Sequence, residues 1–316
     1  MQNSFYIPAS YIKLQASNIG FDACGIAKAE QLHDFKQQYS QWLSLGYNAD
    51  MHYMEQNVEK RSNPALLYPE AQTVISLAVA YKPSFRLCHP PFVAQYAYSD
   101  DYHSKIKTML FRLINTIQAD YPTFNAIPYV DTAPISDKIW AQRCGLGWIG
   151  KHTLLVNPRL GSWINIGELV CNAQSDYDEA MQNRCGKCTR CIDACPNAAI
   201  TQNGVNANRC IAYHTIENKA DNLPNDIDLC GYVFGCDICQ KACPYNAQVE
   251  AKIDIDETRK EQLSSIGNAD KVSFKKITKN TAMDRIKYSQ LIRNIEKNKN
   301  NKKYNIRWKY VVNRIG

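Results

Sequence analysis

The sequence predicts an α+β fold in three parts: a helix-and-sheet domain over residues 1–183, a cysteine-rich module over 184–248 and a basic helical tail over 249–316. Three observations support this division. Helical and strand-like apolar patterns alternate through the first half of the chain. Nine of the 13 cysteines lie between Cys185 and Cys243. Residues 271–316 carry 14 Lys and Arg against 2 Asp and Glu, whereas the remaining residues are mildly acidic.

The elements of the first domain follow from the spacing of apolar residues. Steps of three and four residues predict helices over 10–16, 29–45, 101–118 and, opened by Pro134, 134–143. Short apolar or alternating runs predict strands over 20–27, 73–81, 125–131, 154–156 and 163–170. Gly145, Gly147 and Gly150 match the dinucleotide fingerprint G-x-G-x-x-G, which works only between a strand and a following helix. Here a helix precedes it and a strand follows, so we predict no nucleotide site.

The cysteine module begins with Cys185, Cys188, Cys191 and Cys195-Pro196, in the spacing C-x2-C-x2-C-x3-C-P. Two-cluster ferredoxins use this run to hold [4Fe-4S] clusters, and its fourth cysteine binds the other cluster. A second motif supplies Cys236, Cys239 and Cys243. The spacing therefore assigns Cys185, Cys188, Cys191 and Cys243 to one cluster and Cys195, Cys236 and Cys239 to the other. Either Cys210 or Cys230 can complete the second set.

Other chemistries fit this cysteine pattern poorly. Structural zinc sites use two Cys-x-x-Cys pairs, and disulfide scaffolds need an oxidising compartment. The chain begins MQNSFYIPAS without a signal segment, and no run of about 18 apolar residues predicts a membrane span. We therefore predict a reduced, cytoplasmic protein. We expect core thiols at Cys24, Cys88, Cys144 and Cys171, and structural histidines at His33, His52, His89 and His152.

The basic tail predicts a polyanionic partner, because clustered Lys and Arg are the electrostatic footprint of nucleic-acid binding. A disordered tail would be poor in aromatic residues. This tail interleaves its charges with Phe274, Tyr288, Tyr304, Trp308 and Tyr310. We therefore expect a folded contact surface for nucleic acid.

Motifs throughout the chain resemble the epoxyqueuosine reductase family. They cover nearly the whole sequence, and the family's helical-repeat extension at the carboxyl end is missing, as in a short form. The matching segments are 46–54, 59–64, 74–81, Asp101-Tyr-His103, Tyr129-Val-Asp131-Thr-Ala-Pro134, 145–151, Gly161-Ser162, Gly167-Glu168, Arg209-Cys210-Ile211, 234–240 and Arg293-Asn294.

This resemblance implies a reductive-dehalogenase-like, cobalamin-binding α/β domain with an inserted two-cluster ferredoxin-like module. It implies reduction of epoxyqueuosine to queuosine in the anticodon loop of tRNA, the last step of queuosine biosynthesis. Electrons from an external low-potential donor would pass through two [4Fe-4S] clusters to cobalamin. The expected partner is the tRNA anticodon stem-loop, bound by the basic tail. No membrane partner is expected, and no dimer signal is visible, so we expect a monomer.

The resemblance also implies roles for individual residues. Asp131 matches the family's proton donor, and Asp101 and His103 resemble a polar pair lining the substrate pocket. The resemblance favours Cys210 over Cys230 as the last cluster ligand. Candidate cobalamin contacts are Arg61, Tyr98, Asp131, Gly161, Ser162 and Asp237.

Three other functions are compatible with parts of the sequence. A reductive-dehalogenase-like enzyme would act on a small molecule and would not need the basic tail. A ferredoxin-type electron-transfer protein would leave the first domain without a task. A tRNA-binding structural protein would have no use for low-potential clusters.

Overall fold

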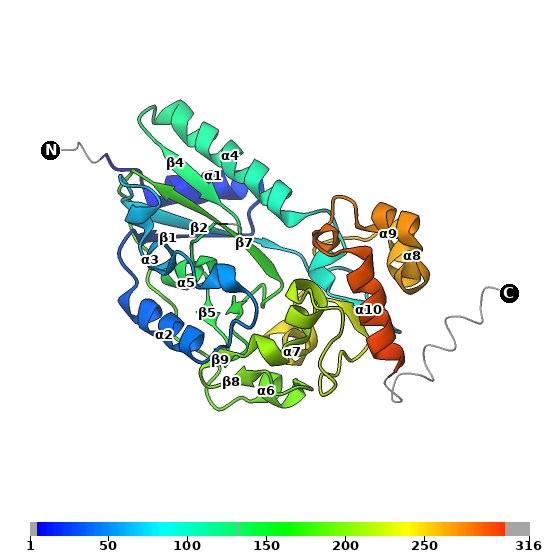
Figure 1. Cartoon of the computed structure of the whole chain (residues 1–316). Helices are drawn as coiled ribbons and strands as arrows, with labels where there is room; N and C mark the ends of the chain where they lie inside the picture. The colour runs from blue at the N-terminus through cyan, green and yellow to red at the C-terminus, as the bar shows by residue number, and fades with distance from the viewer. Residues whose placement is uncertain (1–4, 132, 301–316) are drawn as a thin grey trace. The chain divides into compact units, whose positions relative to one another are not determined.

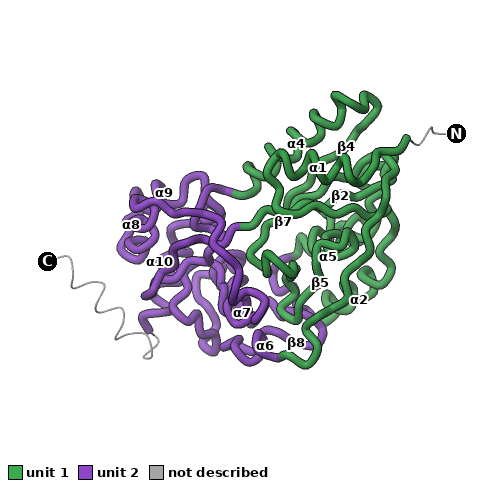
Figure 2. Tube along the Cα trace, turned by 180° about the vertical axis from the view of Figure 1, so that it is seen from behind, with its two compact units in different colours: residues 1–45, 52–80, 102–188 green, residues 46–51, 81–101, 189–316 purple. Residues whose placement is uncertain are grey.

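The computed structural model describes residues 5–131 and 133–300, and its chain forms two compact units (Figure 1, Figure 2). The first unit comprises residues 1–45, 52–80 and 102–188, and the second comprises 46–51, 81–101 and 189–316. Both units therefore draw on segments that are far apart in the sequence. The sequence analysis predicted three continuous domains with boundaries after residues 183 and 248. Each compact unit of the structure instead combines several separate segments of the chain.

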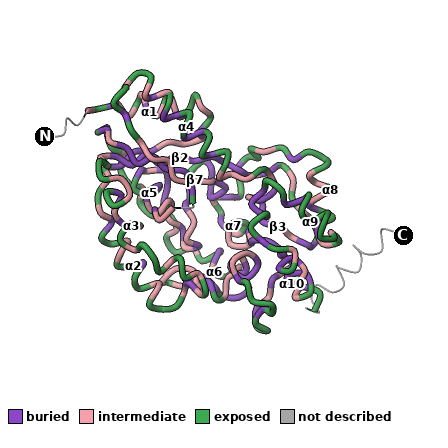
Figure 3. Tube along the Cα trace, turned by 45° about the horizontal axis from the view of Figure 1, so that its top comes forward, coloured by how far each residue is buried: buried purple, intermediate pink, exposed green. Residues whose placement is uncertain are grey.

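The first unit is built on an antiparallel sheet. In the described part of the chain its strands have the order β1-β2-β7-β4. Their bounds are β1 Ala23–Lys28, β2 Thr73–Ala80, β4 Ala126–Tyr129 and β7 Ile164–Cys171. β2 is buried along its whole length (Figure 3), as expected for a central apolar strand. Between β4 and β7 in the chain, β5 Trp148–Ile149 and β6 Leu155–Val156 form a separate two-stranded antiparallel ladder.

Helices cover both faces of this sheet (Figure 1). Alternate strand residues face opposite sides, so Ile75 and Leu169 pack with α1 and α4, whereas Val74 and Val170 pack with Trp140 of α5. The even-numbered residues of β2 and β7 therefore point their side chains toward α5. The helices of this unit are α1 Ala9–Ile19, α2 His33–Ser44, α3 Val58–Ser62, α4 Tyr102–Asp120 and α5 Asp137–Arg143.

The second unit combines the part of the cysteine module that follows Cys188 with the described part of the tail. Its core joins Phe234 with apolar residues of the tail such as Leu263, Phe274, Met283 and Leu291. Its helices are α6 Arg190–Ala194, α7 Ile238–Ala242, α8 Glu257–Ser265, α9 Lys271–Thr278 and α10 Tyr288–Lys299, and its strands are β3 Phe92–Val93, β8 Ile200–Thr201, β9 Gly204–Val205 and β10 Tyr232–Phe234. The first half of the tail is therefore folded onto the unit that carries the second cysteine motif.

Several predicted boundaries were wrong by a few residues. The helix predicted over 29–45 begins at His33, and the helix predicted from Pro134 begins at Asp137. The strand predicted over 125–131 ends at Tyr129. Asp131 has a φ of 52°, a left-handed conformation that cannot continue a strand.

The prediction that Cys88 is a core thiol was wrong, because Cys88 is exposed. Cys144 and Cys171 are buried and Cys24 is partly buried, as expected. Cys88 follows β2 in a segment without regular structure that leads to Pro90-Pro91, which explains its place at the surface. The structure shows no helix, among the residues it describes, that is long and apolar enough to cross a bilayer.

The glycines that match the dinucleotide fingerprint do not form a nucleotide site, and Gly147 is needed for packing instead. The motif lies between α5 and β6 and contains β5, so it does not open a helix. A Cβ atom on Gly147 would stand 2.2 Å from the carbonyl oxygen of Val156. The glycine is needed because two main-chain segments approach closely.

Candidate functional site

The carboxylate of Asp131 is held by two side chains from the first turn of α4. The hydroxyl of Tyr102 donates to Asp131 Oδ2 at 2.9 Å, and Nε2 of His103 lies 3.3 Å from the same oxygen. The two rings stack with their centroids 4.0 Å apart. The Asp131 side chain is 51% exposed, whereas that of His103 is 19% exposed. An accessible carboxyl beside a histidine can take a proton from the ring and present it outward.

The structure brings together two of the three predicted catalytic residues, Asp131 and His103, within the first unit. Asp101 belongs to the second unit, where its main-chain N–H donates to the carbonyl oxygen of Asn280 at 2.7 Å. The predicted role of Asp101 stays a prediction. Tyr102 was not among the predicted site residues, although its position beside His103 at a helix start was a usable signal.

Sequence reasoning missed three polar residues that lie close enough to feel the charge of Asp131, namely Asp137, Lys138 and Glu168, and it took His152, which feels the charge of Lys138, as structural. Desolvation lowers the pKa of Lys138, although the residue as a whole is exposed, and the charges of Asp131 and Asp137 oppose this shift. Glu168 is completely buried. The sequence offered little warning, because each of these residues lies within an apparently ordinary helix, strand or turn.

His152 is buried with one ring nitrogen unsatisfied. Its Nδ1 accepts the main-chain N–H of Leu154 at 3.2 Å, so Nε2 carries the proton of the neutral ring. Nε2 has no hydrogen-bond partner among the described residues. Burial, together with the charge of Lys138, lowers the pKa of His152 to about 4. The imidazole ring is therefore neutral at physiological pH and can donate a hydrogen bond from Nε2. The sequence analysis treated His152 as structural, and a structural role does not explain this buried donor.

The two cysteine motifs form matching helical turns in the second unit. α6 contains Cys191 and is followed directly by Cys195, and α7 contains Cys239 and is followed directly by Cys243. The two helices pack against each other. Both terminal cysteines have an extended backbone, which is the conformation that a following proline favours. The C-P step therefore ends each helix and leaves the last cysteine of each motif on an extended main chain.

The thiols predicted for the second cluster are neighbours. Burial raises the pKa of Cys239 to about 12, and the nearby thiols of Cys210 and Cys195 add to the shift. Burial also raises the pKa of Cys236, with Cys239 and Cys210 again among the causes. The main-chain N–H of Ala199 donates to Cys195 Sγ at 3.3 Å. Four neighbouring, partly buried thiols are a donor set that fits an iron–sulfur cluster, which would bind them as thiolates.

Cys230 occupies a different setting. Its φ is 51°, and its main-chain N–H donates to Asp228 Oδ1 at 2.8 Å. Cys210, although 26 residues before Cys236 in the sequence, is among the thiols that raise the pKa of that residue. These contacts favour Cys210 as the fourth ligand of the second cluster.

The thiols predicted for the first cluster come from both units. Cys185 and Cys188 belong to the first, Cys191 and Cys243 to the second. Within the first unit the ammonium of Lys151 donates to the carbonyl oxygens of Gly186 and Cys188, each at 2.9 Å. No three His, Cys, Asp or Glu side chains of the described residues are close enough to hold a single metal ion. A cubane is larger than one ion, and its thiolates stand farther apart.

The candidate cobalamin contacts also divide between the units. Arg61, Asp131, Gly161 and Ser162 lie in the first unit. The Arg61 guanidinium stands 6.0 Å from the ring centroid of Tyr39 and donates to the carbonyl oxygen of Tyr53 at 3.3 Å. Gly161 has a φ of 60° and exchanges main-chain hydrogen bonds with Asn157, and Ser162 is buried.

Tyr98 and Asp237 are the candidates in the second unit. Both are buried. Asp237 Oδ2 accepts the main-chain N–H of Gln95 at 3.1 Å and lies 3.6 Å from Lys241 Nζ. Asp237 Oδ1 is buried without a partner among the described residues. A buried, unsatisfied carboxylate oxygen is costly unless another group completes it, so this residue fits a polar cofactor with amide donors.

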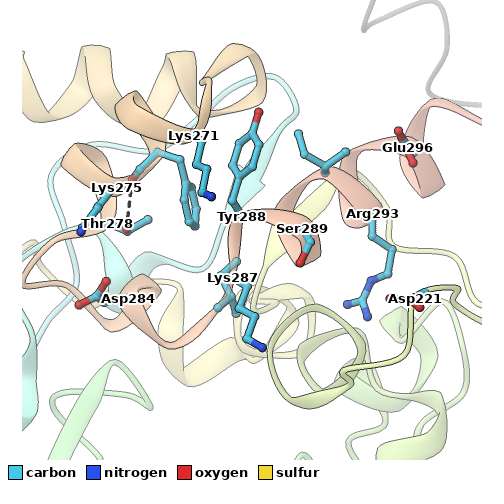
Figure 4. Close-up of a pocket in the computed structure, with 13 residues that line it drawn as sticks. Asp221, Lys271, Lys275, Thr278, Asp284, Lys287, Tyr288, Ser289, Arg293 and Glu296 are labelled. Atoms are coloured by element: carbon cyan, nitrogen blue, oxygen red, sulfur yellow. Dashed lines mark hydrogen bonds between the residues drawn. The ribbon is translucent and has the colours of Figure 1, made fainter.

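A groove of about 760 Å³ lies on the described part of the tail (Figure 4). Lys271, Lys275 and Lys287 line it together with Phe274 and Tyr288, whose rings are 5.6 Å apart. The other lining residues are Asp221, Thr278, Asp284, Ile286, Ser289, Ile292, Arg293 and Glu296. Lysines beside aromatic rings match the pattern predicted for nucleic-acid contact, whereas Tyr304, Trp308 and Tyr310 lie outside the described residues.

Comparisons with known proteins agree with this arrangement. Residues 61–132 match the family model "Epoxyqueuosine reductase QueG, DUF1730", and residues 184–246 match the "4Fe-4S double cluster binding domain". The epoxyqueuosine reductase of Leadbetterella byssophila is 38% identical over 290 residues, which are 90% of this chain and 96% of that protein. The chain belongs to the epoxyqueuosine reductase family.

Other members of the family give the same result. The epoxyqueuosine reductase of Synechocystis sp. is 38% identical over 274 residues, 83% of this chain and 94% of that protein. The structure of epoxyqueuosine reductase from Streptococcus thermophilus superposes with a TM-score of 0.81 at 27% identity, covering 92% of this chain and 80% of that one. An epoxyqueuosine reductase solved with an epoxyqueuosine-modified tRNA-Tyr stem loop gives a TM-score of 0.79 at 25% identity, with the same coverage. The family assignment predicted from the motifs is confirmed.

Proposed function

We propose that this chain reduces epoxyqueuosine to queuosine in the anticodon loop of tRNA, with Asp131 delivering a proton to the epoxide oxygen. The observation that carries the proposal is the hydrogen-bonded group of Asp131, Tyr102 and His103 in a member of the epoxyqueuosine reductase family. The reaction consumes two electrons and two protons, converts the epoxide to an alkene and releases its oxygen as water.

Proton delivery follows from the contacts of Asp131. The leaving oxygen gains negative charge as its C–O bond breaks, so a proton must be available at that atom. The half-exposed carboxyl of Asp131 would supply it and remain as a carboxylate. Protonated His103, 3.3 Å away, would then return a proton to Asp131. The hydroxyl of Tyr102 keeps the carboxyl in place during this exchange.

Two cofactor types would work with these residues. The double-cluster domain would pass electrons one at a time from an external low-potential donor. The chemistry that a bound cobalamin would supply is two-electron reduction at carbon. Within this chain, the unsatisfied oxygen of Asp237 is the strongest candidate contact for it, with Arg61, Tyr98, Gly161 and Ser162 as further candidates. Cys185, Cys188, Cys191 and Cys243 would hold one cluster; the other would use Cys195, Cys210, Cys236 and Cys239.

The tail would position the tRNA. Lys271, Lys275 and Lys287 offer phosphate contacts, which fix a nucleic acid without reading its sequence. Tyr288 offers an aromatic edge beside them. We assign tRNA contact to the segment 249–316, and we place the reaction in the cytoplasm, where tRNA is modified.

The test is an anaerobic assay of the chain reconstituted with iron, sulfide and cobalamin. Epoxyqueuosine-containing tRNA and a low-potential reductant should yield queuosine, detected by mass spectrometry of digested nucleosides. Asp131→Asn should lower kcat about 10²–10⁴-fold, whereas the matched acid-to-amide control Asp22→Asn should not. Absence of queuosine with both cofactors bound would refute the proposal, and turnover of a small halogenated substrate instead would favour the dehalogenase-like alternative.

A further inference from the structure

Residues 46–51 form a short segment that belongs to the second unit, whereas the residues on both sides of it belong to the first (Figure 2). Its main chain is tightly turned, since the N–H of Ala49 donates to the carbonyl oxygen of Gly46 at 3.3 Å. Gly46 has a φ of 65° and Ala49 has a φ of 50°. The left-handed conformation is unfavourable for alanine, and a strained main chain persists only where its surroundings hold it. Contacts with the rest of the second unit therefore maintain the shape of this segment.

The segment is hydrogen bonded to the residues that precede Cys210. The main-chain N–H of Ala207 donates to the carbonyl oxygen of Tyr47 at 2.8 Å. The side-chain amide of Asn208 donates to the carbonyl oxygen of Gly46, also at 2.8 Å. The carbonyl oxygen of Ala207 in turn accepts the main-chain N–H of Cys210 at 2.9 Å. A single residue, Ala207, therefore links the segment to the main chain of Cys210.

Tyr213 links the segment to the residues that follow Cys210. Its hydroxyl donates to Asp50 Oδ2 at 2.8 Å and accepts the main-chain N–H of Asp50 at 3.2 Å. Tyr213 is buried and opens the π-helical turn Tyr213–Glu217. Its neighbour His214 donates from the main-chain N–H to the carbonyl oxygen of Cys210 at 3.1 Å. The segment is therefore bonded on both sides of Cys210, and π-helical turns frequently mark functional sites.

We propose that segment 46–51 is a positioning element for Cys210, with Asp50 and Tyr213 as its main contact, and that it keeps the thiol of Cys210 in place for the second cluster. The inference rests on the proposed assignment of Cys210 to that cluster. The other proposed ligands belong to the two spaced motifs, whose helices α6 and α7 pack against each other. Cys210 lies outside both motifs, so its position depends on other contacts. Groups around a metal ligand orient it and increase metal affinity.

The size of the effect follows from the hydrogen bonds at Tyr213. Iron can leave the second cluster faster when the turn that carries Cys210 opens, and the segment opposes this local opening. One net hydrogen bond changes such an equilibrium by about twofold to tenfold. Two hydrogen bonds from Asp50 meet at the hydroxyl of Tyr213. Removing that hydroxyl should therefore speed iron loss from the second cluster about tenfold.

Anaerobic release of iron from the reconstituted holoprotein to an excess of a ferrous chelator measures this effect. Electron paramagnetic resonance of the reduced protein distinguishes the two clusters. Tyr213→Phe should lose the second cluster about tenfold faster than wild type and the first at the wild-type rate. Asp50→Leu keeps the main-chain hydrogen bond to Tyr213, so its release should be about threefold faster. Asp50→Asn keeps a side-chain oxygen that accepts from Tyr213, so its release should stay within about twofold.

Tyr11→Phe is the matched control. The hydroxyl of Tyr11 donates to Oδ2 of the exposed Asp120 at 2.6 Å, a second tyrosine–aspartate pair, which lies in the first unit. Its loss should leave iron release from both clusters unchanged. Equal acceleration in Tyr11→Phe and Tyr213→Phe, or acceleration of both clusters together, would overturn the inference. If Tyr213→Phe fails to fold, equal release from Asp50→Leu and Asp50→Asn would overturn it instead.

Cys210→Ala separates failure of the inference from failure of the ligand assignment. Loss of one cluster in Cys210→Ala, with wild-type release in Tyr213→Phe, would overturn the inference alone. Retention of both clusters in Cys210→Ala would overturn the assignment and the inference together. These measurements need no turnover, so an inactive wild-type enzyme would count against the proposed function only.

Discussion

Arg293 on α10 offers the sharpest test of how the tail supports the cluster module. It is 8% exposed, and all of its guanidinium nitrogens donate to acceptors within the second unit. The main-chain acceptors are the carbonyl oxygens of His214, Asn218 and Ala220. His214 lies in the π-helical turn Tyr213–Glu217, which follows Cys210. We predict that Arg293→Lys destabilises this turn and the cluster site beside it.

The magnitude follows from the bonds that lysine cannot replace. Three main-chain carbonyls receive charged hydrogen bonds of 2.5–2.9 Å from Arg293. An ammonium group presents its donors from one point and reaches one or two of them. Leaving one or two buried carbonyls unpaired costs about 1–3 kcal/mol each. The free energy of unfolding should therefore fall by about 2–4 kcal/mol, and iron should dissociate faster from the second cluster.

A matched control lies in the same unit. Arg285 pairs with Glu217 at 2.8 Å, but its side chain is 46% exposed, and exposed pairs contribute about 0–1 kcal/mol. Urea unfolding and iron release would be followed anaerobically for Arg293→Lys, Arg285→Lys and wild type at equal cluster loading. Equal losses in the two variants would refute the claim that Arg293 organises the turn after Cys210.

Three further predictions concern the clusters, a glycine and the buried acid. Cys210→Ala should retain about four irons per chain instead of about eight, whereas Cys230→Ala should retain all; loss from Cys230→Ala alone would reverse our ligand assignment. Gly147→Ala should destabilise the protein by about 3 kcal/mol, because its Cβ would stand 2.2 Å from the carbonyl oxygen of Val156; unchanged urea unfolding would contradict this. Burial raises the folded-state pKa of Glu168, so its contribution to the free energy of unfolding should fall by about 1.4 kcal/mol per pH unit between pH 4.5 and that raised pKa. Glu168→Gln should remove this part of the pH dependence, and a variant that keeps the wild-type slope would disprove the prediction.

Patterns that depend on local chemistry were predictable from the sequence. The strand over 73–81 and the helix over 101–118 appear as β2 and α4, because their apolar periodicity is long and regular. The cysteine spacing predicted a double-cluster domain, which the family model for residues 184–246 confirms. The ends of helices and strands were less predictable. For example, α5 begins at Asp137, three residues after the proline that was expected to open it.

Features that depend on distant contacts were missed. Cys230 is nearer than Cys210 to Cys236 in sequence, yet the fold brings the thiol of Cys210 to Cys236 and Cys239. Glu168 lies in a strand of ordinary apolar pattern, and nothing local indicates that its carboxyl is buried or that Asp137, 31 residues earlier, contributes to raising its pKa. Chemistry made by two segments cannot be recognised until the fold joins them.

α10 shows why the tail should not be regarded as a simple cationic extension. Its charge predicted a partner, and Lys287 at its start does line the groove that we assign to tRNA contact. The inward side is different: Asn294 Nδ2 donates to the carbonyl oxygens of Thr215 and Val233, at 3.1 and 3.0 Å. These are buried main-chain groups of the π-helical turn and of β10, the strand just before Cys236. The same helix therefore presents a lysine to the groove and an amide to peptide groups that neighbour the proposed ligands of the second cluster, so the proposed tRNA contact and the proposed cluster site share one support.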